Sequence, residues 1–278
     1  MSLNLFRFTG GKSKMLGVLS NNYPKNEEFD YYIEPFIGSG WSFFNAIEKL
    51  RYNIHNFVLG DINKEIVWAF EALRGDWWKT VAKSLEDLNK QYMSLSYEKK
   101  SDLYYTIRKQ FNNDYIDKID KVIYLFFLNS SGYNGLYRKN QKGEYNVPWS
   151  KKEKLYLNKD WETIHEVLNS VDIEFHIGSF LELNPLEYEN AFWYFDPPYH
   201  NNHTAYSAEG FGEDKQIQLK EFCDQVNDMS SKFMLSNSNT EFIMNLYKGY
   251  NIQQISTKRV IRAMLGNTDC TELLVTNY

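Results

Sequence analysis

The chain has 278 residues, of which 43% are hydrophobic and 24% charged, with a net charge of −5 at neutral pH. These values predict a globular protein built from one large domain, or from one domain that carries an inserted subdomain. The longest apolar run, residues 122–128, is too short to cross a bilayer, and the acidic balance argues against a protein that coats itself with nucleic acid.

Short strands and helices alternate in the first sixty residues. A helix is expected shortly after residue 13, a strand over residues 31–36, a helix over 42–50 and a second strand over 56–62. A strand, a glycine-containing loop, a helix and a strand in this order form a βαβ unit, which implies a parallel sheet.

The middle of the chain has a different pattern. Residues 64–130 are predicted to be helical, and a loop rich in Gly, Asn and Lys follows over 129–159. Within it, residues 138–159 hold seven Lys and Arg against two Glu, a basic segment in an acidic chain. After a helix at 161–169, strands are expected at 173–180, 191–196, 232–237, 250–256 and 271–278. We therefore predict an α/β domain formed by residues 1–67 and 159–278, with a mainly helical insertion over 68–158.

Two glycines follow the first predicted strand. The segment EPFIGSG, residues 34–40, places Gly38 and Gly40 between that strand and a helix. Glycine permits positive φ and close backbone approach to a ligand, and open parallel sheets bind ligands at the carboxyl ends of their strands. The spacing matches neither GxGxxG nor a phosphate loop, so a nucleotide-type ligand and a plain tight turn both stay open.

Two charged residues near these strands are ambiguous in the same way. Asp61, in LGDIN, ends the second predicted strand, where an acid either accepts hydrogen bonds from ribose hydroxyls or caps the next helix. Lys12, in TGGKSK, lacks the frame of a Walker loop and is either solvated or the partner of an anionic group such as a carboxylate.

The segment FDPPY, residues 195–199, is the most specific pattern in the chain. Asp196 ends an apolar, aromatic strand and places a carboxylate at the ligand-binding edge of the sheet. Pro197 and Pro198 fix φ and have no N–H that could compete for an acceptor. The turn therefore presents the Asp196 carboxylate and the Pro197 carbonyl to an amino group, and Tyr199 can stack on a planar ring beside them.

In this order the motifs resemble those of the DNA adenine-N6 methyltransferases of the Dam type, the D12 class, nearly from end to end. FRFTGGK is similar to the family's N-terminal motif, EPFIGSG to its glycine loop, LGDIN to its ribose-binding acid, DPPY to its catalytic tetrapeptide and ELLVTNY to its C-terminal strand. Residues 129–149, NSSGYNGLYRKNQKGEYNVPW, are similar to its target-recognition loop. The resemblance implies a Rossmann-like methyltransferase sheet with an inserted, mainly helical target-recognition domain.

By this resemblance the chain would transfer a methyl group from S-adenosylmethionine to N6 of an adenine flipped out of duplex DNA. Asp196 and the Pro197 carbonyl would accept the hydrogens of the amine, and Pro198 and Tyr199 would complete the catalytic turn. The implied cofactor-binding residues are Phe8, Gly10, Lys12, Glu34, Phe36, Gly38, Gly40, Asp61, Ile62, Ser179, Phe180 and Asp196. The resemblance implies no metal.

The resemblance also assigns DNA contacts. Arg138 is the residue type for a bidentate contact with guanine, and Tyr133 would fill the gap left by the flipped base. Leu136 and Pro148 would pack on thymine methyl groups, and Arg7 stands where relatives commonly have a lysine that contacts a base. The implied DNA-binding residues are Arg7, Tyr133, Asn134, Leu136, Arg138, Lys139, Lys142, Asn146, Pro148, Lys151 and Lys152. A solvated basic loop is the alternative interpretation.

Two positions depart from the family pattern. Ser179 stands where many relatives have an acid that helps to hold the adenine of the cofactor, so we expect this contact to depend on Phe180 and backbone groups. After NVPW the chain reads SKKEKLY, unlike the FGRY of enzymes that methylate GATC and closer to a lysine-containing variant of restriction-modification relatives. GATC stays the favoured site, but this departure leaves a GATC-containing or related site open, in a restriction-modification system or an orphan or phage enzyme.

Two other functions stay open: an RNA amino-group methyltransferase, and a non-catalytic DNA-binding module on the same fold. The expected partners are duplex DNA and, functionally, a cognate restriction endonuclease, with no membrane; we expect a monomer. The N-terminus has no signal-peptide pattern, and Cys223 and Cys270 are far apart, so the sequence predicts a cytoplasmic protein with reduced thiols.

Overall fold

One mixed sheet forms the centre of the computed structural model, which describes residues 3–7, 12–155, 157, 159–201, 211–259 and 268–278. The strands within these ranges are β1 (Tyr31–Glu34), β2 (Asn56–Asp61), β3 (Asp172–Ile177), β4 (Ala191–Phe195), β5 (Lys232–Ser238), β6 (Asn251–Arg259) and β7 (Thr268–Thr276). Their order is β3-β2-β1-β4-β5-β7-β6. The pairs among β1 to β5 are parallel, whereas β7 is antiparallel to both β5 and β6.

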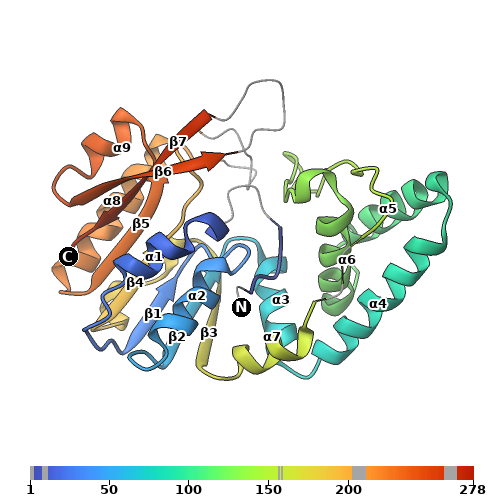
Figure 1. Cartoon of the computed structure of the whole chain (residues 1–278), viewed down its shortest axis with the longest axis horizontal. Helices are drawn as coiled ribbons and strands as arrows, with labels where there is room; N and C mark the ends of the chain where they lie inside the picture. Colours follow the sequence, from blue (N-terminus) through green and yellow to red (C-terminus); the bar gives the residue numbers. More distant parts are fainter. Residues whose placement is uncertain (1–2, 8–11, 156, 158, 202–210, 260–267) are drawn as a thin grey trace.

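The helices of the described ranges are α1 (Leu16–Asn22), α2 (Trp41–Leu50), α3 (Lys64–Arg74), α4 (Trp78–Ser94), α5 (Tyr97–Phe111), α6 (Lys118–Ser131), α7 (Trp161–Leu168), α8 (Glu213–Asp228) and α9 (Glu241–Leu246). Short 3₁₀ turns lie at η1 (Lys12–Lys14), η2 (Tyr133–Gly135), η3 (Phe180–Glu182) and η4 (Pro185–Glu187). In Figure 1, α4, α5 and α6 lie together on the opposite side of the molecule from β5, β6 and β7. The predicted α/β fold with a mostly parallel sheet is confirmed. None of the described helices is long and apolar enough to cross a membrane.

The sheet places two of the sequence motifs side by side. From β1 the chain continues to β2 and β3 on one side of the sheet, then returns to β4, which pairs with the other edge of β1. Strand order therefore reverses between β1 and β4, the point at which open sheets of this kind bind ligands. EPFIGSG follows β1 and FDPPY follows β4, so both reach this point. All five side chains of β4 are fully buried, which explains its unbroken apolar sequence.

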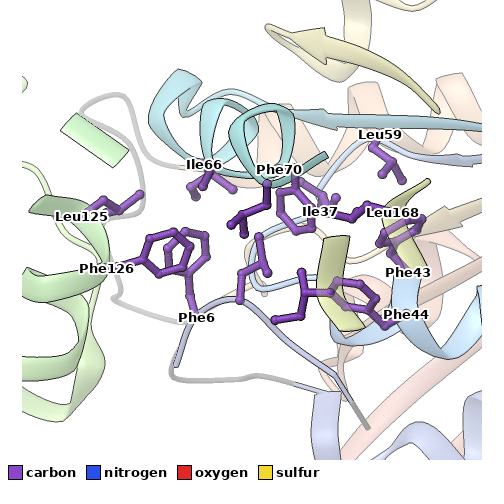
Figure 2. Close-up of a cluster of buried hydrophobic side chains, with 14 of the residues drawn as sticks. Phe6, Ile37, Phe43, Phe44, Leu59, Ile66, Phe70, Leu125, Phe126 and Leu168 are labelled. Atoms are coloured by element: carbon purple, nitrogen blue, oxygen red, sulfur yellow. The ribbon is translucent and has the colours of Figure 1, made fainter. Parts of the chain in front are cut away.

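The sheet and the helices of the central insertion share one hydrophobic core. Phe6, from the N-terminal segment, stacks on Phe126 of α6 with ring centroids 4.7 Å apart. Figure 2 shows these two rings beside Ile66 and Phe70 of α3. The boundary expected between residues 67 and 68 falls inside α3, and we propose that this helix belongs to both parts of the molecule.

Two features of the fold differ from the sequence analysis. The strand expected over residues 173–180 ends at Ile177, so that prediction is wrong for its last residues. The reason is local: the Ser179 hydroxyl accepts from the Leu181 N–H, and the Ser179 N–H donates to the Glu182 carboxylate, which begins η3 instead. Helices α8 and α9 were not predicted. The former mixes apolar positions with many polar ones, and the latter has six residues.

Candidate active site

The turn after β4 contacts the N-terminal motif. Asp196, whose side chain is 21% exposed, lies with its Oδ1 atom 2.9 Å from Nζ of Lys12. Lys12 is buried at the start of η1, the first described residue after the FRFTGG segment. The alternative of a solvated lysine is therefore wrong, because this ammonium group pairs with a carboxylate, as the second interpretation expected.

Tyr199 and Glu272 complete this polar cluster. The Lys12 ammonium donates to the Tyr199 hydroxyl, lies 4.4 Å from the centre of its ring, and is 3.4 Å from Oε2 of Glu272. The Tyr199 hydroxyl in turn donates to Glu272 over 2.7 Å. Burial, and then the charges of Asp196 and Glu272, raise the pKa of Tyr199 well above its ordinary value, so the phenol stays neutral. Sequence analysis missed Glu272, although an acid within the apolar run TELLV was a signal.

Asp61 joins the glycine loop to the end of β2. Its Oδ2 atom accepts from the Gly38 N–H at 3.1 Å, and its Oδ1 atom accepts from the backbone and the side chain of Asn63 at 2.9 and 3.0 Å. Burial raises the pKa of Asp61, and these hydrogen bonds oppose that effect. A carboxylate has about four acceptor positions, and the described residues of the chain fill three of those of Asp61.

Glu34 is fully buried at the end of β1. Its two oxygens accept from the hydroxyl groups of Tyr32, at 2.8 Å, and of Ser42. Burial raises the pKa of Glu34 to about 8; the hydrogen bonds from Ser42 and Tyr32 oppose this increase, and the charge of Asp196 adds to it. Glu34 therefore binds groups of the protein itself, and its carboxyl is protonated at neutral pH.

An aromatic cluster lies beyond the ends of β1 and β3. Phe36 and Phe180 have ring centroids 5.5 Å apart, and Phe211 lies 5.9 Å from the first and 6.2 Å from the second. Phe36 and Phe211 are half-buried, and Ile62, just after β2, is 56% exposed. Phe211 was not found from the sequence, where nothing marks it.

Ser179 has an acid beside it after all. Glu182 accepts from the Ser179 N–H at 2.9 Å, and its carboxylate lies against Gly178 so closely that a Cβ there would collide with it. An acidic side chain, absent at position 179 itself, thus lies against residues 178–179 through the capping turn of η3.

Among the remaining cofactor-binding candidates, Gly40 lies in a tightly packed position. Gly40 has φ of +80° at the start of α2, and a Cβ at this position would lie 2.8 Å from the Phe70 ring, so close packing requires glycine. Phe8 and Gly10 lie outside the described residues. Among the described residues, no group of three or more His, Cys, Asp or Glu is placed to hold a metal ion.

The expected recognition loop, residues 129–149, presents several of its polar residues to solvent. Arg138 donates from Nε to Oδ1 of Asn146 at 2.7 Å, so two DNA-binding candidates form one unit. The candidates that are exposed are Arg7, Tyr133, Asn134, Arg138, Lys142, Pro148 and Lys151, and those that are half-buried are Leu136, Lys139, Asn146 and Lys152.

Helix α5 holds the returning half of this loop by its backbone. Tyr104 and Arg108 donate to the Val147 carbonyl at 2.8 and 3.1 Å. Asn112 accepts from the Tyr145 N–H at 2.8 Å and donates to the Tyr145 carbonyl at 3.0 Å. The position of the loop is thus set by a helix of the central insertion.

The first half of the loop is tied to Arg7. Asn129 accepts from the Arg7 N–H and donates to the carbonyls of Arg7 and Gly135, each at 2.9 Å. Burial, and then the charge of Arg7, lower the pKa of Lys159 to about 8 and also lower the pKa of Lys152. Lys152 and Lys159, from segments distant in the sequence, therefore both experience the charge of Arg7.

Lys139 has a partner within the protein. Its Nζ atom lies 3.1 Å from Oε2 of Glu65, which also accepts from the Tyr137 hydroxyl at 3.1 Å. Burial acts to raise the pKa of Glu65, but Lys139 and Tyr137 outweigh it and the pKa is lowered. This buried carboxylate on α3 links the recognition loop to the segment that follows Asp61.

Comparison with known proteins agrees with this arrangement. The family of D12 class N6 adenine-specific DNA methyltransferases matches residues 8–261. The type II methyltransferase M.MjaIII of Methanocaldococcus jannaschii is 33% identical over 98% of both chains. The type II methyltransferase M1.LlaDCHI of Lactococcus lactis subsp. cremoris is 29% identical, and the DNA adenine methylase of Escherichia coli K12 is 25% identical; each alignment covers 98% of this chain and 94% of the relative. The chain therefore belongs to the D12 class of N6 adenine-specific DNA methyltransferases.

Proposed function

We propose that this adenine-N6 DNA methyltransferase takes its methyl group from S-adenosylmethionine and acts on an adenine that it flips out of a short duplex site. One observation supports the proposal most directly. A nitrogen donor, Nζ of Lys12, lies 2.9 Å from the Asp196 carboxylate and 4.4 Å from the centre of the Tyr199 ring. An exocyclic amine donates to the same carboxylate, and the flat base that carries it stacks on the same ring. N6 is inaccessible while its base is stacked, which is why flipping is part of the proposal.

The residues around the strand ends fit the proposed cofactor. S-adenosylmethionine supplies an electrophilic methyl carbon when it is bound. The half-buried Phe36 and the exposed Ile62 offer apolar surface for its adenine, and Glu182 offers an acceptor for the amino group of that adenine. Asp61 has one acceptor position left for a ribose hydroxyl. Glu34 acts indirectly, by joining the end of β1 to α2 through Ser42, while Tyr32 of β1 holds its other oxygen.

The catalytic turn orients the target amine. Asp196 and the Pro197 carbonyl accept its two hydrogens, so that the nitrogen lone pair points toward the methyl carbon. The Asp196 carboxylate is also positioned to take the proton that the amine loses when the new N–C bond forms. Tyr199, a neutral phenol, stacks on the base, while Lys12 and Glu272 hold the hydroxyl end of its side chain.

The recognition loop supplies the DNA contacts. Arg138 and Asn146 read bases as a pair, and Tyr133 fills the space of the flipped base. Arg7, whose backbone is bonded to Asn129 of the same loop, contacts a further base. Lys142, Lys151 and Lys152 contact phosphates, whereas Lys139 already pairs with Glu65 and positions the loop.

GATC, or a site that contains it, is the favoured target. The names of the first two relatives, both type II methyltransferases, favour a restriction-modification role. The family match, which is to DNA-modifying enzymes, favours DNA over RNA and catalysis over binding alone.

The decisive experiment is expression of the chain in bacteria that lack adenine methylation of their own, followed by sequencing that detects N6-methyladenine in genomic DNA. We expect complete modification of one short motif, and the motif found identifies the site. Absence of N6-methyladenine, although the purified protein is folded, would refute the proposed activity. In vitro, transfer of label from S-adenosylmethionine to duplex DNA but not to RNA of the same sequence tests the cofactor and the substrate together.

A further inference from the structure

A buried chain of side-chain amides lies behind the Asp196–Tyr199 turn. Gln216 of α8 and Asn237 of β5 are both fully buried. The Gln216 Nε2 group donates to the Pro198 carbonyl at 3.0 Å, and the Asn237 Nδ2 group donates to Gln216 Oε1 at 2.9 Å. The Asn237 Oδ1 atom accepts from the N–H groups of His200, at 3.3 Å, and Ser238, at 2.8 Å.

Backbone groups at the two ends of this series of hydrogen bonds fix which group donates and which accepts in every bond. The N–H groups of His200 and Ser238 can only donate, so Asn237 must turn its oxygen toward them and its nitrogen toward Gln216. Gln216 must then offer its oxygen to Asn237 and its nitrogen to Pro198, whose carbonyl can only accept. Both ends demand the same orientation, so neither amide can flip without leaving buried polar groups unpaired.

Consecutive prolines leave one backbone torsion of the turn unfixed, and the hydrogen bonds of Gln216 and Asn237 restrict it. Their rings fix φ, but ψ of Pro198 still sets the direction of the peptide unit that leads to Tyr199. The bond from Gln216 fixes that peptide unit on one side, and Asn237 fixes His200 on the other. Additional bonds from the Ser238 hydroxyl to the His200 carbonyl, and between the Thr240 hydroxyl and Nδ1 of His200, strengthen the second anchor.

We propose that Gln216 and Asn237 are positioning residues for methyl transfer, which hold the turn so that Asp196, the Pro197 carbonyl and Tyr199 meet the target base together. This inference rests on the proposed function of the turn. Neither residue touches the substrate in this account; both act through the Pro198 and His200 backbone. Their loss should therefore lower the rate of transfer while the binding of DNA and of S-adenosylmethionine is retained.

The variant Gln216→Glu tests the inference through pH. A carboxyl group in this buried position keeps its proton at low pH, and its O–H can replace the amide donor to the Pro198 carbonyl. At high pH the deprotonated group repels that carbonyl. We expect the single-turnover rate constant, at saturating duplex and S-adenosylmethionine and relative to wild type at each pH, to fall at least about tenfold between about pH 6 and pH 9. The matched control Gln225→Glu, an exposed position on the same helix, should follow wild type throughout.

Two further variants keep the test decisive if the first unfolds. Gln216→Met, a similar volume without charge or donor, should lower the single-turnover rate constant at every pH, with an unchanged dissociation constant for S-adenosylmethionine. Asn237→Asp keeps the acceptor for His200 but turns an oxygen toward Gln216, so it should slow transfer, and the effects of Gln216→Met and Asn237→Asp should not add.

The outcomes separate this inference from the proposed function. If wild type does not methylate DNA, the proposed function itself fails. If wild type is active and Gln216→Met transfers at the wild-type rate, or Gln216→Glu follows the wild-type pH profile, the positioning role is refuted. If the dissociation constants for duplex or S-adenosylmethionine rise as much as the rate constant falls, Gln216 supports binding in general, and the inference is again overturned.

Discussion

Asp196 faces the ammonium of Lys12, which also contacts Tyr199 and lies 3.4 Å from Glu272. In our proposal the target amine competes with Lys12 for the Asp196 carboxylate. Glu272 offers the displaced ammonium a second carboxylate, so its charge does not become unpaired in a buried place. The chemistry of this residue cluster thus depends on an acid supplied by the antiparallel strand β7 as much as on the DPPY turn.

Replacing Asp196 should separate chemistry from binding. Asp196→Ala removes the acceptor for the target amine, and we expect the rate of methyl transfer to fall by about 10² to 10⁴ or more, because orientation and proton acceptance are both lost. Affinity for duplex DNA should change little. Single-turnover kinetics and a DNA-binding titration measure the two quantities, with Asp172→Ala, an exposed acid at the other end of the sheet, as the control. Transfer at the wild-type rate would disprove the assigned role.

Because Glu34 is buried, it makes the free energy of unfolding depend on pH. Burial raises the pKa of Glu34 to about 8 from its ordinary value of 4.5, so the folded protein keeps a proton that the unfolded chain loses over this range. The contribution of Glu34 to the free energy of unfolding is fully present below about pH 4.5 and is lost as the pH rises through 8. Glu34→Gln cannot ionise, and its stability relative to wild type should rise between pH 5 and 8 by at most about 1.4 kcal/mol per unit.

Urea unfolding at several pH values measures this difference. The exposed residue Glu189 provides the control, and Glu189→Gln should show no comparable trend. A constant difference between Glu34→Gln and wild type across the range would mean that Glu34 is already ionised in the folded protein.

Arg138 should affect site choice more than overall affinity. Arg138→Ala removes a bidentate donor and frees Asn146, and we expect discrimination between the target site and sites with one altered base to fall by about 1–3 kcal/mol. Competition between matched and mismatched duplexes in a methylation assay measures it. Arg51→Ala, an exposed arginine on the sheet side of the molecule, is the control. Unchanged discrimination would exclude Arg138 from base recognition.

At the scale of elements, the recognition loop is held from two directions. Helix α5 binds its returning half through the backbone of Tyr145 and Val147, and Asn129 ties Gly135 to the N-terminal segment. The residues that contact DNA in our proposal are therefore mostly on a supported loop, with exposed or half-buried side chains on a backbone held by hydrogen bonds. Such support limits the entropy lost when the loop binds a duplex.

Two glycines of this loop make a matched pair of variants. Gly135 and Gly143 both have positive φ, +66° and +78°, but a Cβ at Gly135 would lie 2.9 Å from Arg7, whereas one at Gly143 meets open space. Gly143→Ala should cost about 1 kcal/mol of backbone strain, and Gly135→Ala should cost more and displace the loop from Arg7. Thermal unfolding and sequence discrimination measure both effects. Equal behaviour of the two variants would show that the contact with Arg7 does not position the loop.

At the scale of the whole molecule, the sheet and the central helices are not separate cores. Phe6 packs between α6 and the residues of α3 and the glycine loop, as Figure 2 shows. Glu65, Tyr137 and Lys139 add a buried polar link between α3 and the recognition loop. The surface that we propose for DNA and the site that we propose for the methyl donor therefore belong to one packed unit.

This shared core predicts cooperative unfolding. Phe6→Ala removes a fully buried ring and its stacking on Phe126, and we expect a loss of about 3–5 kcal/mol in the free energy of unfolding. Wild type and variant should each unfold in a single transition. Tryptophan fluorescence and far-UV circular dichroism, followed in urea, measure this, with the exposed Tyr115→Ala as the control. Separate transitions for the two probes would show that the helices and the sheet fold independently.

The sequence by itself determined the order of the strands and marked the DPPY turn as the candidate catalytic segment. Strand periodicity and the glycine loop were enough to predict a mostly parallel sheet, because a βαβ unit has few alternatives. The DPPY turn was recognisable because two prolines next to an acid have a narrow range of conformations. The end of β3 was misplaced, since the capping turn at Ser179 competes locally with strand formation, and α8 was missed because its apolar positions are sparse.

Only the tertiary structure decided which distant residues meet. Lys12, Asp196, Tyr199 and Glu272 come from the two ends and the middle of the chain, and sequence separation gives no information on their contact. The partners of Gln216, Asn237 and Glu182 likewise follow from the packing of α8 on β5 and from the turn after β3. Local propensities act over a few residues, whereas the burial of a polar group forces it to find a partner wherever the fold provides one.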